Sequence, residues 1–166
     1  MPSTTTELIK DLRGKTGAGI MECKRALDEG GSIEAAEKLL KQWGLASAEK
    51  KAGREVSQGL IDSYVHAGRI GAMVEINCET DFVARTDDFR TLAREVAMQV
   101  AATNPRRLSS NDPAPEGDPE GDVPLLDQPY IRDGSKTVQQ LLNETIARVR
   151  ENIVIRRFAR FEIGGQ

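Results

Sequence analysis

The most constraining feature of this 166-residue sequence is a pair of β-type runs joined by a short turn. Residues 59–66 and 70–78 are rich in Ile, Val and Tyr, and Ala67-Gly68-Arg69 lies between them. Branched and aromatic residues favour extended backbone, and a turn glycine between two such runs is typical of a β-hairpin. Met73 is apolar on the face of the second run opposite its main apolar stripe, so both faces of this strand can be covered.

Three short helices are predicted before the hairpin, because apolar residues recur there at helical spacing. They span residues 5–13, 20–29 and 32–43, and glycines at positions 14, 30–31 and 44 end them. Ser32 is suited to cap the third helix, since its hydroxyl can accept a hydrogen bond from a first-turn N–H. We therefore expect residues 1–45 to form a three-helix module with a limited core.

A basic, polar connector follows at residues 46–58 and contains Lys50, Lys51 and Arg54. It can be helical in part. A solvated linker is favoured over a phosphate-binding patch, because no aromatic platform accompanies the positive charge.

Helical spacing returns after the hairpin. A helix capped by Thr86 or Asp87 carries an apolar stripe from position 89 to 101 and ends at Asn104-Pro105. Residues 106–123 are rich in Pro, Gly, Asp and Ser and are expected to form an exposed, disordered-like loop. Residues 129–131 resemble a short extended piece, residues 138–149 another amphipathic helix, and residues 153–163 a last strand. We therefore predict an α+β core domain over residues 59–166, a three-stranded antiparallel sheet packed with helices.

The composition narrows the classes of function. The formal net charge is −3, which argues against nucleic acid as the main ligand, since phosphate binders usually carry a basic excess. No apolar run is long enough to span a membrane, and the N-terminus lacks the pattern of a secretory signal. Cys23 and Cys78 are better explained as reduced core residues than as a disulfide framework. The expected location is the cytoplasm.

The sequence contains few of the motifs that are typical of enzyme active sites. The sole histidine, His66, falls at the hairpin and is expected to be a surface residue. There is no P-loop, Rossmann glycine pattern or zinc-ligand spacing, although scattered carboxylates leave paired acid–base chemistry open. The final Gly164-Gly165-Gln166 matches the tripeptide of peptide release factors, but a chain end is expected to fray. We expect neither an enzyme nor a cofactor.

The segment 77–85 stands apart, because it lies between a strand and a helix, where loops carry function on a rigid scaffold. It contains Thr80, Asp81, Phe82 and Val83. On pattern alone, the favoured interpretation is that Phe82 and Val83 fill the space between strand and helix while Asp81 caps the turn.

Three separated signatures resemble the elongation factor Ts family and occur in the family's order. The first comprises Leu12-Arg13, Thr16-Gly17-Ala18-Gly19, Met21, Cys23-Lys24 and Ala26-Leu27; the second runs from Glu75 to Ala84, and the third from Glu151 to Phe158. The similarity extends over nearly the whole chain except residues 106–123.

The resemblance implies that the N-terminal module is similar to the ubiquitin-associated fold and docks on the GTPase elongation factor Tu. Leu12, Ile20 and Met21 are the matching contact candidates, although each is equally well explained as a core residue. It also implies that Thr80, Asp81, Phe82 and Val83 reach the Mg²⁺ end of the partner's nucleotide site. Asp81 and Phe82 are the expected acting residues, while Thr80 and Val83 hold the loop in shape.

The implied function is that of a guanine-nucleotide exchange factor, which promotes GDP release without bond chemistry or a cofactor. The chain has room for one core subdomain, whereas longer family members have a second and a projecting helical hairpin. A homodimer through the core sheet is a possible replacement. Two alternatives remain open: a non-catalytic adaptor in translation, and an RNA-binding protein that uses basic residues. Those residues are Lys50, Lys51, Arg54, Arg156, Arg157 and Arg160.

Overall fold

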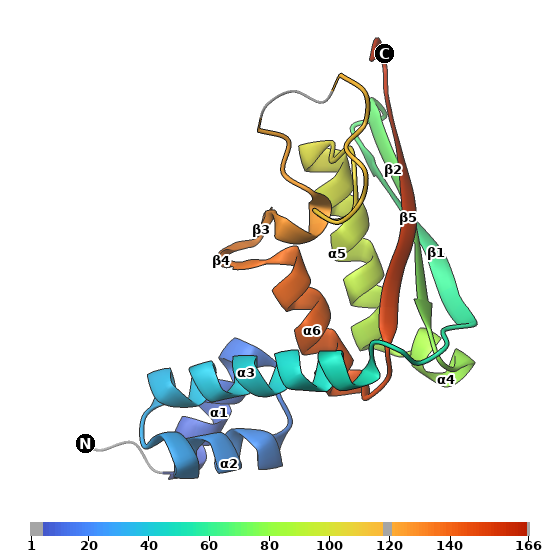
Figure 1. Ribbon diagram of the computed structural model, residues 1–166. Coiled ribbons are helices and arrows are strands. Elements are labelled where there is room, and N and C mark those ends of the chain that lie inside the picture. The colour runs from blue at the N-terminus through green and yellow to red at the C-terminus, as the bar shows by residue number, and fades with distance from the viewer. Residues whose placement is uncertain (1–4, 118–120, 166) are drawn as a thin grey trace.

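The chain has an α+β fold in which three N-terminal helices precede a sheet that helices cover on one face (Figure 1). The computed structural model describes residues 5–117 and 121–165. The predicted fold class is confirmed: the sheet has three antiparallel strands and is packed with helices. The likeness of the N-terminal helices to the ubiquitin-associated fold stays a prediction, as does the division into domains at residues 45 and 58.

The N-terminal helices are α1 (Thr5–Thr16), α2 (Ile20–Gly30) and α3 (Ile33–Lys51). Ser32 caps α3 as predicted, and its Oγ accepts a hydrogen bond from the Ala35 N–H at 3.2 Å. The three helices enclose their own small core, which comprises the buried residues Leu12, Cys23, Ala26 and Ala36.

Two predicted helix ends are wrong. Helix α1 continues through Gly14 to Thr16, and α3 continues through Gly44 to Lys51. Gly44 is buried where α3 passes α6 (Val138–Val149), and a β-carbon added to it would lie 3.8 Å from the Asn143 carbonyl oxygen. Because α3 packs on the core here, tertiary contact outweighs the helix penalty of about 1 kcal/mol for glycine.

The sheet has the strand order β1 (Gln58–His66), β2 (Ile70–Cys78) and β5 (Ile153–Glu162), and both pairings are antiparallel. The predicted hairpin and last strand are confirmed. Gly59, the second residue of β1, has φ +151°, and a β-carbon there would overlap the Ile76 carbonyl oxygen. This position therefore requires glycine.

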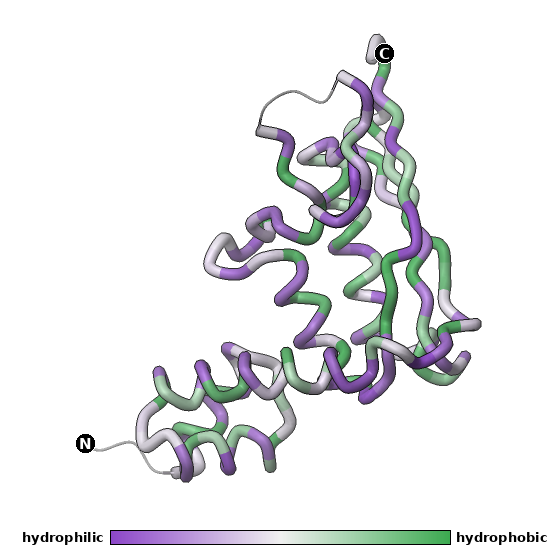
Figure 2. Tube along the Cα trace, in the orientation of Figure 1, coloured by the Kyte–Doolittle hydropathy of each residue, from purple (hydrophilic) through white to green (hydrophobic). Residues whose placement is uncertain are grey.

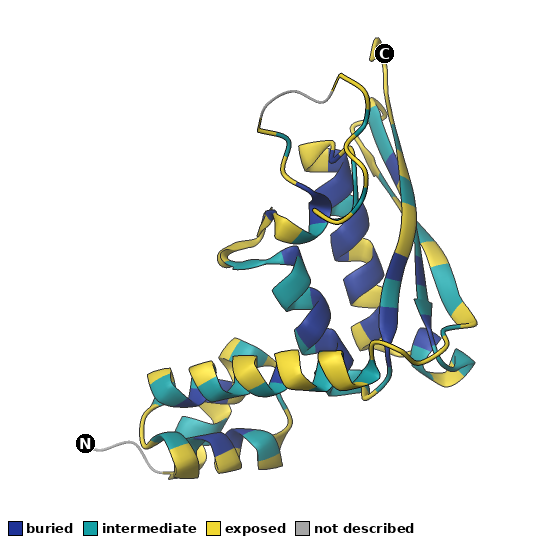
Figure 3. Ribbon diagram, viewed as in Figure 1, coloured by how far each residue is buried: buried dark blue, intermediate teal, exposed yellow. Residues whose placement is uncertain are grey.

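One face of the sheet is covered by α5 (Asp87–Thr103), against which α6 packs (Figure 1). Of the two predicted caps, Thr86 is the one that caps α5, and the helix ends at Asn104 as predicted; Asn104 is in the left-handed conformation. The main core is made by the apolar stripe of α5, the inner face of β2 and one side of α6 (Figure 3). Its largest fully buried side chains include Phe89, Leu92, Ile76 and Ile155.

The opposite face of the sheet is open to solvent. Ile61 and Val65 of β1, Met73 of β2 and Phe161 of β5 are all exposed there. Met73 stands between Ser63 and Ala159 in the register, and Phe161 is in the row of Val65. Figure 2 shows apolar positions recurring along all three strands. The second apolar face of β2 is therefore uncovered in the single chain.

Short elements complete the fold: α4 (Asp81–Ala84), the 3-10 turn η1 (Leu125–Asp127) and the hairpin of β3 (Pro129–Tyr130) and β4 (Asp133–Thr137). The sequence indicated only the extended piece at β3. Tyr130 anchors this hairpin, because its hydroxyl donates to the Glu95 carboxylate of α5 at 2.5 Å.

The described part of segment 106–123 contains neither helix nor strand, as predicted, while residues 118–120 lie outside the described residues. Its first residues are attached to η1, since the Arg107 and Leu108 carbonyls accept hydrogen bonds from Leu125 and Leu126. The weak order expected of this segment stays a prediction. Within the part of the chain that the structure describes, no helix is long and apolar enough to cross a membrane.

Replacing Gly44 with alanine should raise the free energy of unfolding by up to about 1 kcal/mol, because alanine is the better helix former and its methyl group fits beside α6. Urea unfolding followed by circular dichroism measures the change. Gly59→Ala is the contrasting variant and should be destabilised, since its methyl group overlaps the β2 backbone. Equal destabilisation of both variants would contradict the packing described for α3 and α6.

Candidate functional site

The candidate site is the loop that leads from β2 to α5. Thr80 caps α4, and its Oγ1 accepts a hydrogen bond from the Val83 N–H at 3.4 Å. Thr86 then caps α5 and also donates its hydroxyl hydrogen to the Val83 carbonyl at 2.7 Å. Because each helix start is capped by a threonine, the chain passes from strand to long helix through a defined short turn.

The Phe82 side chain points outward. It is 78% exposed, whereas Val83 packs against the main core and Ala84 is buried. The interpretation favoured by pattern alone, in which Phe82 and Val83 both fill the space between strand and helix, is therefore wrong for Phe82; of the two, only Val83 packs there. An exposed aromatic ring beside buried neighbours is a feature typical of a contact surface.

Asp81 does not cap the turn, since Thr80 has that role. The Asp81 carboxylate instead pairs with Arg85 one turn later, at 3.0 Å between Oδ2 and Nη2. Both side chains are half or more exposed, so this pair contributes little to stability. Asp81 can exchange Arg85 for a partner's donor at little free-energy cost.

The loop is held from the other side by Glu151, a residue to which the sequence assigned no role. Its carboxylate accepts hydrogen bonds from the backbone N–H groups of Glu79 and Thr80, at 3.1 and 3.0 Å. It also accepts the Thr80 hydroxyl hydrogen at 2.6 Å. The third signature begins at Glu151, but only the pairing of β5 with β2 reveals what this residue contacts.

The three predicted contact residues of the N-terminal module differ in burial. Leu12 is fully buried between the N-terminal helices, so its side chain belongs to the module core. Ile20 and Met21 form the first turn of α2, and both are exposed. The structure therefore presents Ile20 and Met21, but not Leu12, to a partner. In the view of Figure 1, α2 and α4 both lie along the lower edge of the molecule.

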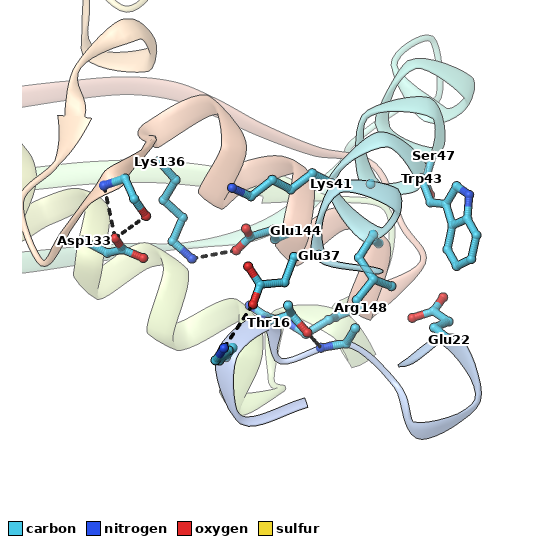
Figure 4. A pocket seen from close by; sticks show the side chains of 16 residues that line it. Thr16, Glu22, Glu37, Lys41, Trp43, Ser47, Asp133, Lys136, Glu144 and Arg148 are labelled. Atoms are coloured by element: carbon cyan, nitrogen blue, oxygen red, sulfur yellow. Dashed lines mark hydrogen bonds and ion pairs between the residues drawn. The ribbon is translucent and has the colours of Figure 1, made fainter. Parts of the chain in front are cut away.

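A cavity of about 410 Å³ lies between the N-terminal helices and α6, with the β4 segment at its rim (Figure 4). Two ion pairs join acidic and basic side chains that line it. Lys136 lies 2.8 Å from Glu144, and Lys15 lies 3.4 Å from Glu37. Such internal pairing is typical of a contact region between parts of one chain, rather than of a pocket for a charged ligand.

His66 is exposed, as predicted, and its ring Nδ1 lies 3.1 Å from the Tyr64 hydroxyl. Over residues 5–117 and 121–165, no group of three or more His, Cys, Asp or Glu side chains is placed to hold a metal ion. The Thr80–Val83 turn with its exposed Phe82 ring, rather than a pocket, is thus the feature that most resembles a contact surface.

The chain is similar to known proteins of one family. A family model described as "Elongation factor TS" matches residues 46–116, which include the whole loop. The elongation factor Ts of Thermoanaerobacter sp. strain X514 is 47% identical, over 96% of this chain and 95% of its own length. That of Finegoldia magna is 43% identical, over 99% of this chain and 91% of its own length.

This chain belongs to the elongation factor Ts family. It is accordingly a translation elongation factor. The alignment with the Thermoanaerobacter protein spans 193 positions, more than the 166 residues of this chain, so that relative contains residues that this chain lacks. All three signatures lie within the described residues: the first runs from α1 to α2, the second from β2 through the loop to α4, and the third from the residues before β5 into that strand.

The thiol of Cys78 provides a probe of the loop. Burial, followed by the nearby Glu151 charge, raises the pKa of Cys78 to about 11, and its Sγ lies 3.1 Å from the Thr80 carbonyl oxygen. Because an ordinary thiol has a pKa of about 8.5, the thiolate fraction at pH 8 should be lower by roughly two orders of magnitude. Because the Cys78 thiol is also fully buried, its alkylation by iodoacetamide in the folded protein should be much slower than that of a free thiol at pH 8 and should rise with pH up to pH 10.

Mass spectrometry of the Cys78 peptide measures that rate. Glu151→Gln should accelerate the reaction, because it removes a negative charge that raises the Cys78 pKa. Cys23 is the internal reference, since burial also raises its pKa but Glu151 is not among the groups that shift it. A rate that levels off near pH 9 would contradict the raised pKa.

Proposed function

We propose that this chain is a guanine-nucleotide exchange factor for elongation factor Tu. It binds the GDP-bound form, disturbs the Mg²⁺ site and promotes GDP release, so that GTP can bind. The observation that carries this proposal is the exposed Phe82 ring on a turn whose backbone is capped and hydrogen-bonded. Membership of the elongation factor Ts family supports the choice of partner.

Phe82 acts as an apolar wedge. Its ring is in water in the free chain, so its insertion between elements of the partner removes a large apolar area from solvent. That gain is available to shift the segments that support the partner's metal site. Val83 and Ala84 remain packed in this protein and give the wedge a firm base.

Asp81 supplies the polar part of the contact. Its exposed ion pair with Arg85 is weak in water, and the carboxylate can turn to N–H or hydroxyl donors of the partner. Such contacts stabilise the displaced arrangement that Phe82 creates.

The partner's metal makes this small displacement effective. Mg²⁺ demands near-ideal octahedral geometry at short distances, and it bridges the phosphates of the bound nucleotide. Moving its ligands by a fraction of an ångström weakens the metal site, and the phosphate charge is then poorly compensated. GDP consequently dissociates faster.

Thermodynamic linkage sets the direction of the cycle. If the factor weakens GDP binding by a given ratio, GDP weakens factor binding by the same ratio, and each tenfold change corresponds to about 1.4 kcal/mol. The factor therefore binds the nucleotide-free partner most tightly and leaves when GTP enters. It makes and breaks no covalent bond and needs no cofactor.

Ile20 and Met21 provide a second contact. Both are exposed apolar residues on the first turn of α2, whose other side is packed in the module core. Docking of this turn on the GTPase domain holds the partner while the loop acts. We place the protein in the cytoplasm, where translation elongation takes place in bacteria.

We also propose that two copies pair through the open face of the sheet. Four large apolar side chains from three strands are exposed on it, around the ion pair of Arg157 with Glu75 at 2.7 Å. Exposed apolar side chains gathered on one face are typical of a protein–protein contact surface. A twofold axis across the face would place each apolar row against its copy, in a self-complementary interface.

Phe82→Ala should lower the maximum rate of fluorescent GDP release from elongation factor Tu by about tenfold or more, because the wedge is removed while the backbone of α4 is kept. Stopped-flow fluorescence at increasing factor concentration measures the rate. Ile131→Ala is the matched control, since it also removes an exposed apolar side chain but on the distant β3–β4 hairpin.

Native release rates in the Phe82 variant would exclude the wedge. Retention of elongation factor Tu by the native protein, without any acceleration of GDP release, would instead support the adaptor alternative.

Sedimentation equilibrium should give the native protein twice the chain mass of 18.2 kDa, and Phe161→Glu should give the single mass. A charge buried without a partner in the apolar face would oppose pairing, whereas it is hydrated in the monomer. Ile131→Glu tests whether any added exposed charge has this effect, and it should stay dimeric. A monomeric native protein would overturn the dimer.

A further inference from the structure

Residues 150–152 form a short connection between α6 and β5, and they lie beside the start of the candidate loop. The antiparallel register pairs Cys78 with Ile153 at one end of the sheet. Glu79 and Thr80, which follow β2, therefore lie beside Asn152 and Glu151, which precede β5. The connection turns sharply, because Arg150 adopts the left-handed conformation at φ +62°.

Two glutamates, one in each segment, accept hydrogen bonds from the other segment. Glu151 accepts from the N–H groups of Glu79 and Thr80 and from the Thr80 hydroxyl. Glu79 in return accepts the Asn152 N–H at 2.7 Å. Hydrogen bonds to an ionised carboxylate are shorter and stronger than neutral ones. The two segments are therefore held by four charge-assisted contacts.

The same cluster reaches the end of α3. The Asn152 side chain is buried, and its Nδ2 donates to the Arg54 carbonyl at 2.9 Å. The Arg54 guanidinium lies 3.5 Å from the Glu79 carboxylate. We call Arg54, Glu79, Thr80, Glu151 and Asn152 the Glu151 clamp. It joins the segment after α3, the end of β2 and the start of β5.

Thr80 is the point at which the clamp meets the working turn. Its hydroxyl donates to Glu151 and accepts from the Val83 N–H, so one side chain belongs both to the clamp and to the cap of α4. Phe82 is exposed and makes few contacts of its own that could orient it. Its direction therefore depends on how α4 is held.

We propose that Glu151 is a positioning residue, which fixes α4 in the orientation that directs Phe82 and Asp81 at the partner. This inference rests on the exchange function proposed above. The Glu151 carboxylate is bonded to the Glu79 and Thr80 backbone and to the Thr80 hydroxyl, and it acts through Thr80. By way of Asn152 and the residues after α3, the clamp also fixes the turn relative to the helix that carries the docking module.

Release kinetics test this role with Glu151→Ala and Glu151→Gln in the full-length protein. The assay measures the maximum rate of fluorescent GDP release from elongation factor Tu and the factor concentration that gives half of it. Glu151→Ala should lower the maximum rate about tenfold and leave the half-saturating concentration within about twofold, since Ile20 and Met21 still dock. Glu151→Gln keeps one acceptor oxygen and should recover part of the rate.

A merely structural role gives a different result. A variant with a misfolded fraction has a lower active concentration, so its half-saturating concentration rises while its maximum rate is unchanged. That pattern would overturn the proposal. Glu144→Ala is the matched control, because it removes a partly buried, ion-paired carboxylate from α6, away from the loop, and should leave both parameters unchanged.

The double variant Glu151→Ala with Phe82→Ala separates the two proposals. If Glu151 acts through the α4 turn that carries Phe82, the double variant should be slowed by less than the product of the two single effects, whereas independent effects would multiply. Multiplied effects would overturn the positioning role. If Phe82→Ala slows release and Glu151→Ala does not, the clamp proposal fails alone; if neither slows release, the exchange mechanism itself fails.

Discussion

The antiparallel pairing of β2 with β5 is the constraint on which the rest of the structure depends. It joins strands more than 70 residues apart in the chain, and its register brings the end of β2 beside the start of β5. Closing so long a loop is entropically unfavourable, and the buried stripe of α5 offsets this by packing on the inner face of the same strands. The loop contacts of Glu151 exist only because this register is kept.

Helix α3 makes the second long-range connection. Its first half shares a core with α1 and α2, while Gly44 and Ala48 in its second half pack on α6 and the main core. The residues after it are bonded by Asn152. The exposed turn of α2 and the exposed turn of α4 are thus linked through one continuous helix and a hydrogen-bonded cluster, and not through a free linker.

The sequence predicted those elements that depend on local signals. Three such signals each depend on residues close together in the sequence: the turn glycine of the hairpin, the cap at Thr86 and the apolar stripe of α6. The predicted bounds of these elements match the structure closely. The prediction that α3 ends at Gly44 was wrong, because the helix continues there through a contact with α6 that no local sequence pattern shows. The direction of Phe82 and the partners of Glu151 depend on strand register, so spacing alone could not predict them; only the family resemblance indicated the loop.

The proposed mechanism requires both the exposed Phe82 ring and the hydrogen-bonded α4 turn that carries it. An exchange factor accelerates release only through contacts that favour the GDP-free state over the GDP-bound one. If α4 became ordered only upon binding, the loss of conformational entropy of the loop would offset part of the binding free energy. Because Thr80 and Glu151 order the turn in the free chain, the burial of the ring is available for displacing the partner. The proposed function therefore requires a backbone fixed by hydrogen bonds and a side chain on it that is exposed to solvent.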